Sequence, residues 1–352
     1  MSNKIAGENH PAARRAARGW SQEEVARRAG ISRAAVSSIE TGAVVPSVQV
    51  ALSLAQVFEC SVEELFAGPA EPRRDNVWAI EPEGPVAGYW EVPEGRDTLR
   101  YPVEAVAMNP FPPDVIVSGG RGKRRAGGGR IPTLTVACCD PAARFFAGEY
   151  EKFSGVRLIV LPRNGRGALE LLKRGAVHVG GIHAATPGEP GANLARVREV
   201  LGRGWVLLRV ADWQSGIALP SGAGRRSVAA IARGTRRWAI REPGAAARDL
   251  LEDLLGTGKP SGRVVAGHQQ VADAVQAGWA EAGITVQLCA LEDRLGFAPL
   301  RVEGLDFVFR ENLLEDPRIR KLVALIQSRA HRQSVSCLPG YSDCRSGLMQ
   351  IS

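Results

Sequence analysis

The sequence predicts a multidomain chain, in which an all-α domain of five short helices precedes a larger α/β domain. Three observations favour this fold class. Between Ser21 and Gly42, two short helical segments flank a tight turn. After Ile131, apolar strand segments alternate regularly with amphipathic helical segments. The 352 residues are enough for two or three domains of ordinary size.

The two helices of the tight pair carry clear start and stop signals. Ser21 can accept a bond from a backbone amide, and Glu24, three residues later, can reach back to the capping residue. Ser32 repeats this cap for the second helix, which ends at Gly42, a residue type that tolerates a left-handed stop. Further helices are predicted at residues 12–18, 47–58 and 61–66.

Residues 12–67 resemble the lambda-repressor-like (Cro/C1, XRE-type) DNA-binding domain. The resemblance is carried by the segments RGWSQEEVARRAGISRAAVSSIETG and VPSVQVALSLAQVFECSVEELF. It implies that residues 1–68 form a helix-turn-helix domain, in which the second helix of the pair enters the major groove of double-stranded DNA. The helix at 12–18 departs from the family, because alanine and arginine stand where leucine or isoleucine is usual.

The resemblance also implies individual DNA contacts. Arg33 and Ala34 would face base edges, where an arginine can donate two bonds to guanine. An exposed surface arginine is the alternative for Arg33, and serines in a short helix can bond their own backbone instead. Other positions match phosphate contacts, which fix the register without reading sequence. The implied DNA-binding residues are Gln22, Ser32, Arg33, Ala34, Ser37, Ser38 and Thr41.

The net charge of +8 is spread unevenly and does not by itself indicate DNA binding. Residues 1–68 have seven Lys or Arg and seven Glu and so carry no net charge, whereas 69–120 carry −5 and 121–130 carry +5. The six cysteines include no CxxC pair, and no apolar signal or membrane segment is evident. We therefore expect a cytoplasmic protein with reduced cysteines and no membrane partner.

Residues 69–130 change character, with nine prolines and no helical periodicity. The segments VAGYWEVP and DTLRYPVEAV contain strand formers, so a small antiparallel β unit is predicted within this connector. The run RGKRRAGGGR at 121–130 has the composition of a flexible basic tether. It either links the domains or adds nonspecific attraction to phosphates.

Residues 131–330 are predicted to form the α/β domain, and 331–352 a C-terminal tail. No GxGxxG fingerprint opens the first unit, which disfavours a dinucleotide site. Strands are predicted at 133–138, 156–161, 176–182, 205–210, 238–241, 282–286 and 305–309. Helices are predicted from 141 and at 165–174, 227–233, 245–255, 269–278 and 317–329.

Residues 131–330 also resemble the PBP-like substrate-binding domain that is fused to helix-turn-helix regulators, a relative of the periplasmic molybdate-binding proteins. The resemblance rests on the ordered blocks ACCDPAARFFA, RNGRGALELLKRGAVHVGGIHAATPGEPGAN, ADWQSGIAL, REPGAAARDLLEDLL, GHQQVADAVQAGWAEAGI and GLDFVFRE. It implies a two-lobed type II periplasmic-binding-protein-like fold. Helix N-termini would surround a cleft between the lobes, where their unpaired amides attract an anion or a polar ligand.

The same resemblance implies which residues face the cleft. The family commonly has hydroxyl residues where this chain has alanine at 245–247, so donors to an oxyanion are missing and molybdate binding is expected to be weak. Trp213 and Gln214 either line the cleft or pack the crossover between the lobes. The ligand-binding candidates are Asp140, Asn164, Arg166, His183, Gln214, Arg241, Gly244, Arg248 and His268.

Three histidines in this domain, His178, His183 and His268, suggest zinc. Two of them, five residues apart at a strand end, are more typical of core or hinge side chains, so we expect no metal site and no cofactor. No GxSxG, no HExxH and no evident Cys/His nucleophile pair is present, so no catalytic residue is assigned.

The two resemblances together imply a ligand-responsive, one-component bacterial-type transcriptional regulator. A homodimer would bind operator DNA, because one small helix-turn-helix buries little surface. A small oxyanion or polar organic effector would shift the DNA-bound population. Two alternatives stay open: a DNA-binding regulator with a degenerate, ligandless second domain, and an enzyme fused to a helix-turn-helix.

Overall fold

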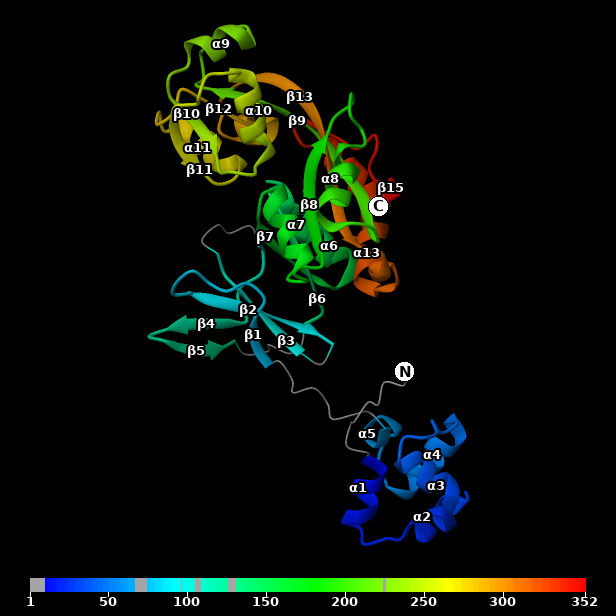
Figure 1. Cartoon of the computed structure of the whole chain (residues 1–352). Helices are drawn as coiled ribbons and strands as arrows, with labels where there is room; N and C mark the ends of the chain where they lie inside the picture. Colours follow the sequence, from blue (N-terminus) through cyan, green and yellow to red (C-terminus); the bar gives the residue numbers. More distant parts are fainter. Residues whose placement is uncertain (1–9, 67–74, 96, 105–108, 126–130, 224–225) are drawn as a thin grey trace. The chain divides into compact units, whose positions relative to one another are not determined.

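The computed structural model describes residues 10–66, 75–95, 97–104, 109–125, 131–223 and 226–352. The chain divides into two compact units, Met1–Arg74 and Asp75–Ser352, and each is described by itself (Figure 1). Within the described ranges, no helix is long and apolar enough to cross a membrane.

Unit 1 is a cluster of five helices, as the sequence predicts. Ser21, Ser32 and Ser47 cap three of them by accepting a bond from a backbone amide three residues later. Gly30 ends one helix in the left-handed region, with φ +66°. The helices are α1 His10–Ala17, α2 Gln22–Ala29, α3 Arg33–Glu40, α4 Val48–Val57 and α5 Val62–Phe66. Their shared core contains Val25, Val36, Ile39, Leu54, Phe58 and Leu65.

Arginine contacts hold α1, which lacks the aliphatic residues usual at this place. Arg15 donates through Nε and Nη2 to the buried carboxylate of Glu40, at 2.6 and 3.1 Å. Arg18 donates to the carbonyl of Phe58 at 2.9 Å and lies over the ring of Trp20. Trp20 in turn stacks on Phe58, with ring centroids 5.9 Å apart. A charge-assisted pair and stacked rings therefore replace the missing aliphatic contacts.

Unit 2 begins with the predicted small β unit, a five-stranded sheet in the order β1-β3-β2-β4-β5. The prediction of an antiparallel unit is wrong for one pair, because β1 pairs with β3 in parallel. The tether predicted at 121–130 is wrong for its first residues, because Arg121–Arg124 form β5 and pair with β4. Gly119 and Gly120 both have positive φ, which suits a two-residue hairpin turn, and residues 126–130 lie outside the described part. The strands are β1 Asp75–Trp78, β2 Gly88–Glu94, β3 Asp97–Pro102, β4 Val115–Ser118 and β5 Arg121–Arg124.

The β unit shares a hydrophobic core with the α/β part of unit 2. Trp90 and Tyr101 belong to one buried cluster with residues of the α/β sheet, and the Tyr101 hydroxyl donates to the carbonyl of Ala176 at 2.8 Å. Arg157 donates to Asp114 at 2.8 Å in a buried ion pair. The segment that the sequence describes as a connector is therefore packed against the domain that follows it.

The α/β part is built on one mixed sheet with the strand order β11-β10-β12-β9-β13-β8-β6-β7. We call its two ends lobe A and lobe B. Lobe A contains β6 Thr133–Cys138, β7 Arg157–Pro162, β8 Val179–Ala185, α6 Ala143–Ser154, α7 Gly165–Lys173, α8 Ala192–Leu201, α13 Pro317–Gln327 and α14 Arg329–Ser336. Lobe B contains α9 Val228–Gly234, β10 Trp238–Arg241, α10 Ala246–Leu255, β11 Gly262–Val265, α11 His268–Gln276, β12 Ala282–Val286 and α12 Gln287–Glu292.

Two long antiparallel strands, β9 Trp205–Leu219 and β13 Gly296–Arg310, belong to both lobes (Figure 1). The end of β9 pairs with β12 in lobe B, and the end of β13 pairs with β8 in lobe A. The sequence predicts only the apolar half of each strand, 205–210 and 305–309. The other halves contain polar residues that hide the strand pattern.

The predicted C-terminal tail at 331–352 is wrong, because these residues pack onto the α/β part of unit 2. The helix α14 extends to Ser336, and β14 Tyr341–Ser342 and β15 Met349–Ile351 each pair antiparallel with β9. Strands of two or three residues carry no readable alternation of apolar and polar side chains, so the sequence pattern does not predict them.

Candidate functional site

The first turn of α3 presents the predicted base contacts. Ser32 caps this helix and accepts from the backbone amide of Ala35 at 3.1 Å. Arg33 and Ala34 are exposed, and the Arg33 Nε lies 3.9 Å from a carboxylate oxygen of Glu23. Ser37 and Ser38 are half-buried on the same helix. The first turn of α3 is thus accessible to a DNA groove.

Gln22 and Thr41, the predicted phosphate contacts, already make internal hydrogen bonds. Gln22 donates through Nε2 to Glu40 at 2.9 Å. Thr41 donates through Oγ1 to the carbonyl of Ser37 at 2.9 Å. An amide group has a second N–H and a hydroxyl has free lone pairs, so each side chain retains one group for a backbone contact.

A cavity of about 510 Å³ opens between lobe A and lobe B. Its walls come from segments around the N-termini of α6, α7 and α11, and from the end of β10. This is the convergence of helix N-termini that the resemblance implies. The lining residues are Glu104, Cys139, Pro141, Arg144, Pro162, Arg163, Asn164, Arg241, Glu242, Ala266, Gly267, His268, Gln269, Gln270 and Glu292.

Two arginines of the cavity wall are already paired with carboxylates. Arg163 donates through Nη1 and Nη2 to Glu104, at 2.7 and 2.6 Å. Arg241, which is 2% exposed, donates through Nε and Nη2 to Glu242, at 2.7 and 2.9 Å. Each fork-shaped pair neutralises the guanidinium charge that an oxyanion would need.

Asn164 connects the two lobes at the rim of the cavity. It caps α7 by accepting from the amide of Gly167 at 2.9 Å, and it donates across the gap to Glu242 at 3.1 Å and to the carbonyl of Pro243 at 3.3 Å. Beside it, a Cβ on Gly244, where φ is +88°, would lie only 3.1 Å from the Nε of Arg166. The predicted ligand residues Asn164, Arg166 and Gly244 therefore form the contact between the lobes.

A buried polar cluster adjoins the cavity, whose lining includes Cys139 and His268. The Sγ of Cys139 lies 3.2 Å from the Nε2 of His183, whose Nδ1 lies 2.9 Å from Glu303. Glu303 also accepts from the indole of Trp213 at 3.0 Å. The ring centroids of His268 and His183 lie 5.9 Å apart, with the rings tilted by 55°. The ligand atoms of Cys139, His183 and His268 all lie within 4.8 Å of one another, so these three residues could hold a metal ion.

The surroundings of the cluster shift the pKa values of His183 and His268 in opposite directions. Burial alone lowers the pKa of His183, but the adjacent Cys139 sulfur and Glu303 carboxylate outweigh burial and raise that pKa to about 10. Burial raises the pKa of Glu303, but its bond and charge interaction with His183 hold that pKa well below its usual range. Burial and the charge of Arg241 lower the pKa of His268. The surroundings therefore favour the charged form of His183 and the neutral form of His268.

Family models match both halves of this architecture. A model described as a PBP superfamily domain matches residues 147–327, slightly more than half of the chain. The chain belongs to the PBP superfamily. A helix-turn-helix model matches residues 12–65, so a DNA-binding domain of a transcription regulator precedes this PBP-like substrate-binding domain. Both resemblances predicted from the sequence are confirmed.

Solved structures similar to the PBP-like domain share little sequence with it. A putative phosphate transporter substrate-binding protein with bound phosphate from Clostridium perfringens is 12% identical over 58% of this chain and 96% of that chain, with a TM-score of 0.46. A reduced form of OxyR from N. meningitidis is 13% identical over 60% and 98%, with a TM-score of 0.42. The tungstate-binding protein TupA from Desulfovibrio alaskensis is 14% identical over 60% and 98%, with a TM-score of 0.41. No curated protein matches the sequence significantly.

Several predicted ligand residues of the PBP-like domain lie away from the cavity or are engaged elsewhere. Gln214 donates to the carbonyls of Ser215 and Arg301, at 3.0 and 2.9 Å, and so packs the crossover strands. Arg248 donates to Glu252 at 2.8 Å, within α10. The alanines at 245–247 are not among the described residues that line the cavity.

Asp140 is buried behind the cavity wall, where it accepts from the Tyr341 hydroxyl at 2.6 Å. Burial raises the pKa of the Asp140 carboxyl, although the bond from Tyr341 acts in the opposite direction. Tyr341 belongs to β14, in the segment that the sequence assigns to a tail. The predicted Asp140 therefore supports the cavity wall from behind.

Sequence reasoning missed several residues of this site, among them Glu104, Arg163, Cys139, Glu242, Glu303 and Tyr341. It found no Cys/His pair, whereas the structure places Cys139 against His183. One signal was available for Cys139, because it directly follows the predicted strand 133–138, and the carboxyl ends of parallel strands border ligand sites. Glu303 gives no such signal, since it sits within a strand that crosses between lobes.

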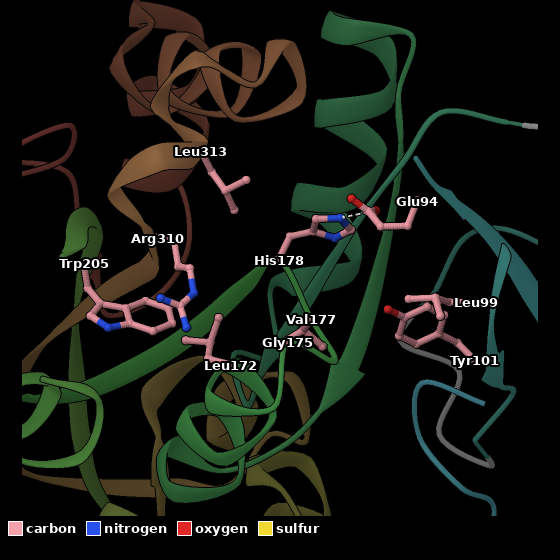
Figure 2. Close-up of a pocket in the computed structure, with 10 residues that line it drawn as sticks. All are labelled: Glu94, Leu99, Tyr101, Leu172, Gly175, Val177, His178, Trp205, Arg310 and Leu313. Carbon is pink, nitrogen blue, oxygen red and sulfur yellow. Dashed lines mark hydrogen bonds and ion pairs between the residues drawn. The ribbon is translucent and has the colours of Figure 1, made fainter. Parts of the chain in front are cut away.

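A second cavity, of about 170 Å³, lies between the β unit and lobe A (Figure 2). Figure 2 shows the His178 ring directed at Glu94, and the Nε2 of His178 lies 2.8 Å from its carboxylate. The Nδ1 of His178 lies 2.7 Å from the Thr135 hydroxyl. His178 therefore joins the β unit to lobe A, because its two ring nitrogens contact Glu94 and Thr135. It is not part of the cluster that contains His183 and His268.

Proposed function

We propose that the chain is a ligand-responsive transcriptional regulator whose PBP-like domain binds a small polar effector between lobe A and lobe B. The position of the cavity is the observation that supports this proposal most. Its lining comes from both lobes, and Asn164 of lobe A bonds Glu242 of lobe B at its rim. A ligand seated there contacts both lobes, so its binding favours one arrangement of them and changes the population that binds operator DNA.

The chemistry of the cavity wall favours a polar organic effector over a small oxyanion. The fork-shaped pairs of Arg163 with Glu104 and of Arg241 with Glu242 leave the wall with both signs of charge. The volume of about 510 Å³ falls in the range typical of sites for organic ligands. The Gln269 side chain donates to Asp273 and Asp293, and that of Gln270 accepts from the Ala266 amide. The carbonyl oxygen of Gln269 can therefore accept from a ligand of mixed polarity, and the NH2 group of Gln270 can donate to it.

We propose further that two copies bind one operator. A single helix-turn-helix buries little surface on DNA, and domains of this kind read half-sites about one helical turn apart. Four exposed aliphatic residues lie within nine positions of unit 1: Val44, Val45, Val48 and Leu52. Val45 and Val48 are 91% and 79% exposed, so contact with a second copy would remove apolar surface from water.

Operator selection followed by footprinting tests the DNA-binding half of the proposal. The full chain is used to select sequences from a random library, and the selected site is footprinted at rising protein concentration. We expect a two-fold or repeated site occupied by two chains. A single half-length footprint with one chain per site would disprove the dimer, and the absence of any selected sequence would disprove the regulator.

A further inference from the structure

The buried cluster of Cys139, His183 and His268 has the composition and spacing of a transition-metal site. All three side chains are buried, at 8%, 5% and 2% exposure. Their ligand atoms lie within 4.8 Å of one another, and the Cys139 Sγ lies 3.2 Å from the His183 Nε2. In a tetrahedral zinc site, sulfur and nitrogen ligand atoms lie about 3.3–3.6 Å apart. The third ligand atom would have to approach by no more than about 1.5 Å to complete that geometry.

The hydrogen bonds around the cluster leave the metal-facing atoms available. Glu303 engages the Nδ1 of His183 at 2.9 Å and so directs Nε2 toward Cys139, in the carboxylate–histidine arrangement of metal sites. The Nε2 of His268 is buried and has no hydrogen-bond partner among the described residues. A buried nitrogen without a partner is costly, and a metal ion would supply the partner it lacks.

We propose that Cys139, His183 and His268 bind one transition-metal cation of the zinc class, with a fourth coordination position open to the cavity. A thiolate with two imidazoles selects zinc, cobalt or copper over magnesium and calcium, which require oxygen ligands. Because thiolate and neutral imidazole are the forms that bind a metal, binding releases protons to solvent. This proposal departs from the expectation, drawn from histidine spacing alone, that the domain has no metal site.

The charges around the cluster accommodate a cation. Arg241 lies close enough to influence both Cys139 and His268, which opposes a metal ion. Its guanidinium is paired with Glu242 at 2.7 and 2.9 Å, and Glu303 carries a second negative charge next to His183. Glu303 is in turn paired with Arg301 at 2.7 Å, so each arginine next to the cluster is matched by a carboxylate and no uncompensated arginine charge opposes a bound cation.

The proposed ligands come from both lobes. Cys139 follows β6 and His183 lies in β8, both in lobe A, whereas His268 begins α11 in lobe B. A bound cation would therefore tie the lobes together beside the cavity. An effect of the bound cation on operator binding rests on the proposed function. The metal site itself rests on this geometry alone.

Metal titration of the full chain tests the site directly. Protein freed of metal by a chelator is titrated with Zn²⁺ and with Co²⁺ in a C337S/C344S background, because Cys337 and Cys344 are exposed and could bind metal adventitiously. We expect one ion per chain and, with cobalt, the thiolate charge-transfer and tetrahedral ligand-field bands. Cys139→Ser and His268→Asn should each lower zinc affinity by more than about 100-fold, and Glu303→Gln by about 10- to 100-fold.

Matched control variants show whether any loss is specific. Cys289 is a buried thiol outside the cluster, and His331 is a buried histidine whose Nε2 also lacks a partner and whose Nδ1 lies 3.0 Å from Glu149. Cys289→Ser and His331→Asn should bind zinc as the parent does. Where a ligand variant fails to fold, the cobalt spectrum of the parent decides, and an absence of thiolate charge transfer overturns the proposal. Unchanged affinity in Cys139→Ser or His268→Asn overturns it as well.

Metal binding and DNA binding are measured separately, so that the two proposals fail independently. Zinc affinity is measured without DNA, and operator affinity is measured on chelated protein. Loss of one-to-one zinc binding with intact operator binding would remove the metal site and leave the regulator in place. Intact zinc binding without a selected operator would disprove the regulator and leave the metal site in place.

Discussion

Arg33 is the residue on which sequence-specific DNA recognition would depend most. Its side chain is 67% exposed at the first turn of α3. Because a bidentate contact to guanine discriminates by about 1–3 kcal/mol, Arg33→Ala should relax the base preference at one operator position. Gln22→Ala should instead weaken binding to all sequences alike, since a phosphate contact carries no sequence information. Binding-site selection on each variant measures both effects.

Arg196→Ala is the control for this pair of variants. It removes one positive charge from unit 2, where Arg196 bonds only the exposed Glu199 among the described contacts. It should change neither the affinity nor the preferred sequence. If Arg33→Ala lowered affinity uniformly and kept the preferred sequence, the assignment of base contacts to the first turn of α3 would be wrong.

Glu94 gives the stability of unit 2 a specific dependence on pH. Burial alone raises its pKa, but bonds from His178 and Arg318 outweigh burial and lower that pKa to about 2. The unfolded value is 4.5, so the stabilisation is present above about pH 4.5 and is lost as the pH falls toward 2. Because the side chain is 39% exposed, solvent screening reduces the effect to about 1 kcal/mol.

Glu94→Gln should therefore be about 1 kcal/mol less stable than the parent at pH 7, and the difference should vanish near pH 2. Urea unfolding of the full chain at pH 7, 4 and 2.5 measures the free energy of unfolding. Glu199→Gln removes a carboxylate that is 67% exposed and should change little at any pH. A difference that persisted unchanged at pH 2.5 would mean that Glu94 acts through packing and not through its charge.

At the scale of elements, local signals account for most of the predicted structure. Serine caps and glycine stops predict the helices of unit 1, and the apolar run at 133–138 coincides with β6. Prediction failed where an element depends on distant partners. The strands β9 and β13 continue through polar stretches because each is paired along its length with the other. The helix α1 likewise depends on the Arg15–Glu40 pair, which no local pattern indicates.

At the scale of the whole molecule, the sequence predicts the place of the site better than its composition. Helix N-termini mark the cleft, because strand and helix order fix which ends meet in an α/β sheet. The chemistry at that place depends on register. Cys139, His183 and Glu303 come from three different strand segments, and only the sheet order β13-β8-β6 brings them together. The sequence alone does not predict that sheet order. Each carboxylate, thiol and imidazole in it is equally compatible with a purely structural role.

The effector preference follows from the same whole-molecule geometry. Molybdate and tungstate should bind weakly or not at all, because Glu104 and Glu242 neutralise the charges of Arg163 and Arg241 that would attract an oxyanion. Thermal unfolding of the full chain, freed of metal so that an anion cannot bind through an ion, is measured against both oxyanions and a panel of polar organic compounds. A true effector at about one hundred times its dissociation constant should add about 2.7 kcal/mol of stability.

Charge-neutralising variants decide whether paired arginines are the cause. Glu242→Gln leaves the guanidinium of Arg241 without its carboxylate, so oxyanion affinity should rise about tenfold, equivalent to about 1.4 kcal/mol. Glu104→Gln does the same for Arg163, and Glu199→Gln, far from the cavity wall in sequence and exposed, is the control with the same charge change. Submicromolar molybdate binding by the parent would contradict the argument. If the parent bound no oxyanion and neither variant improved binding, paired arginines would not be the cause of weak binding. The shape of the cavity would then be the cause, because each variant already removes one opposing carboxylate charge.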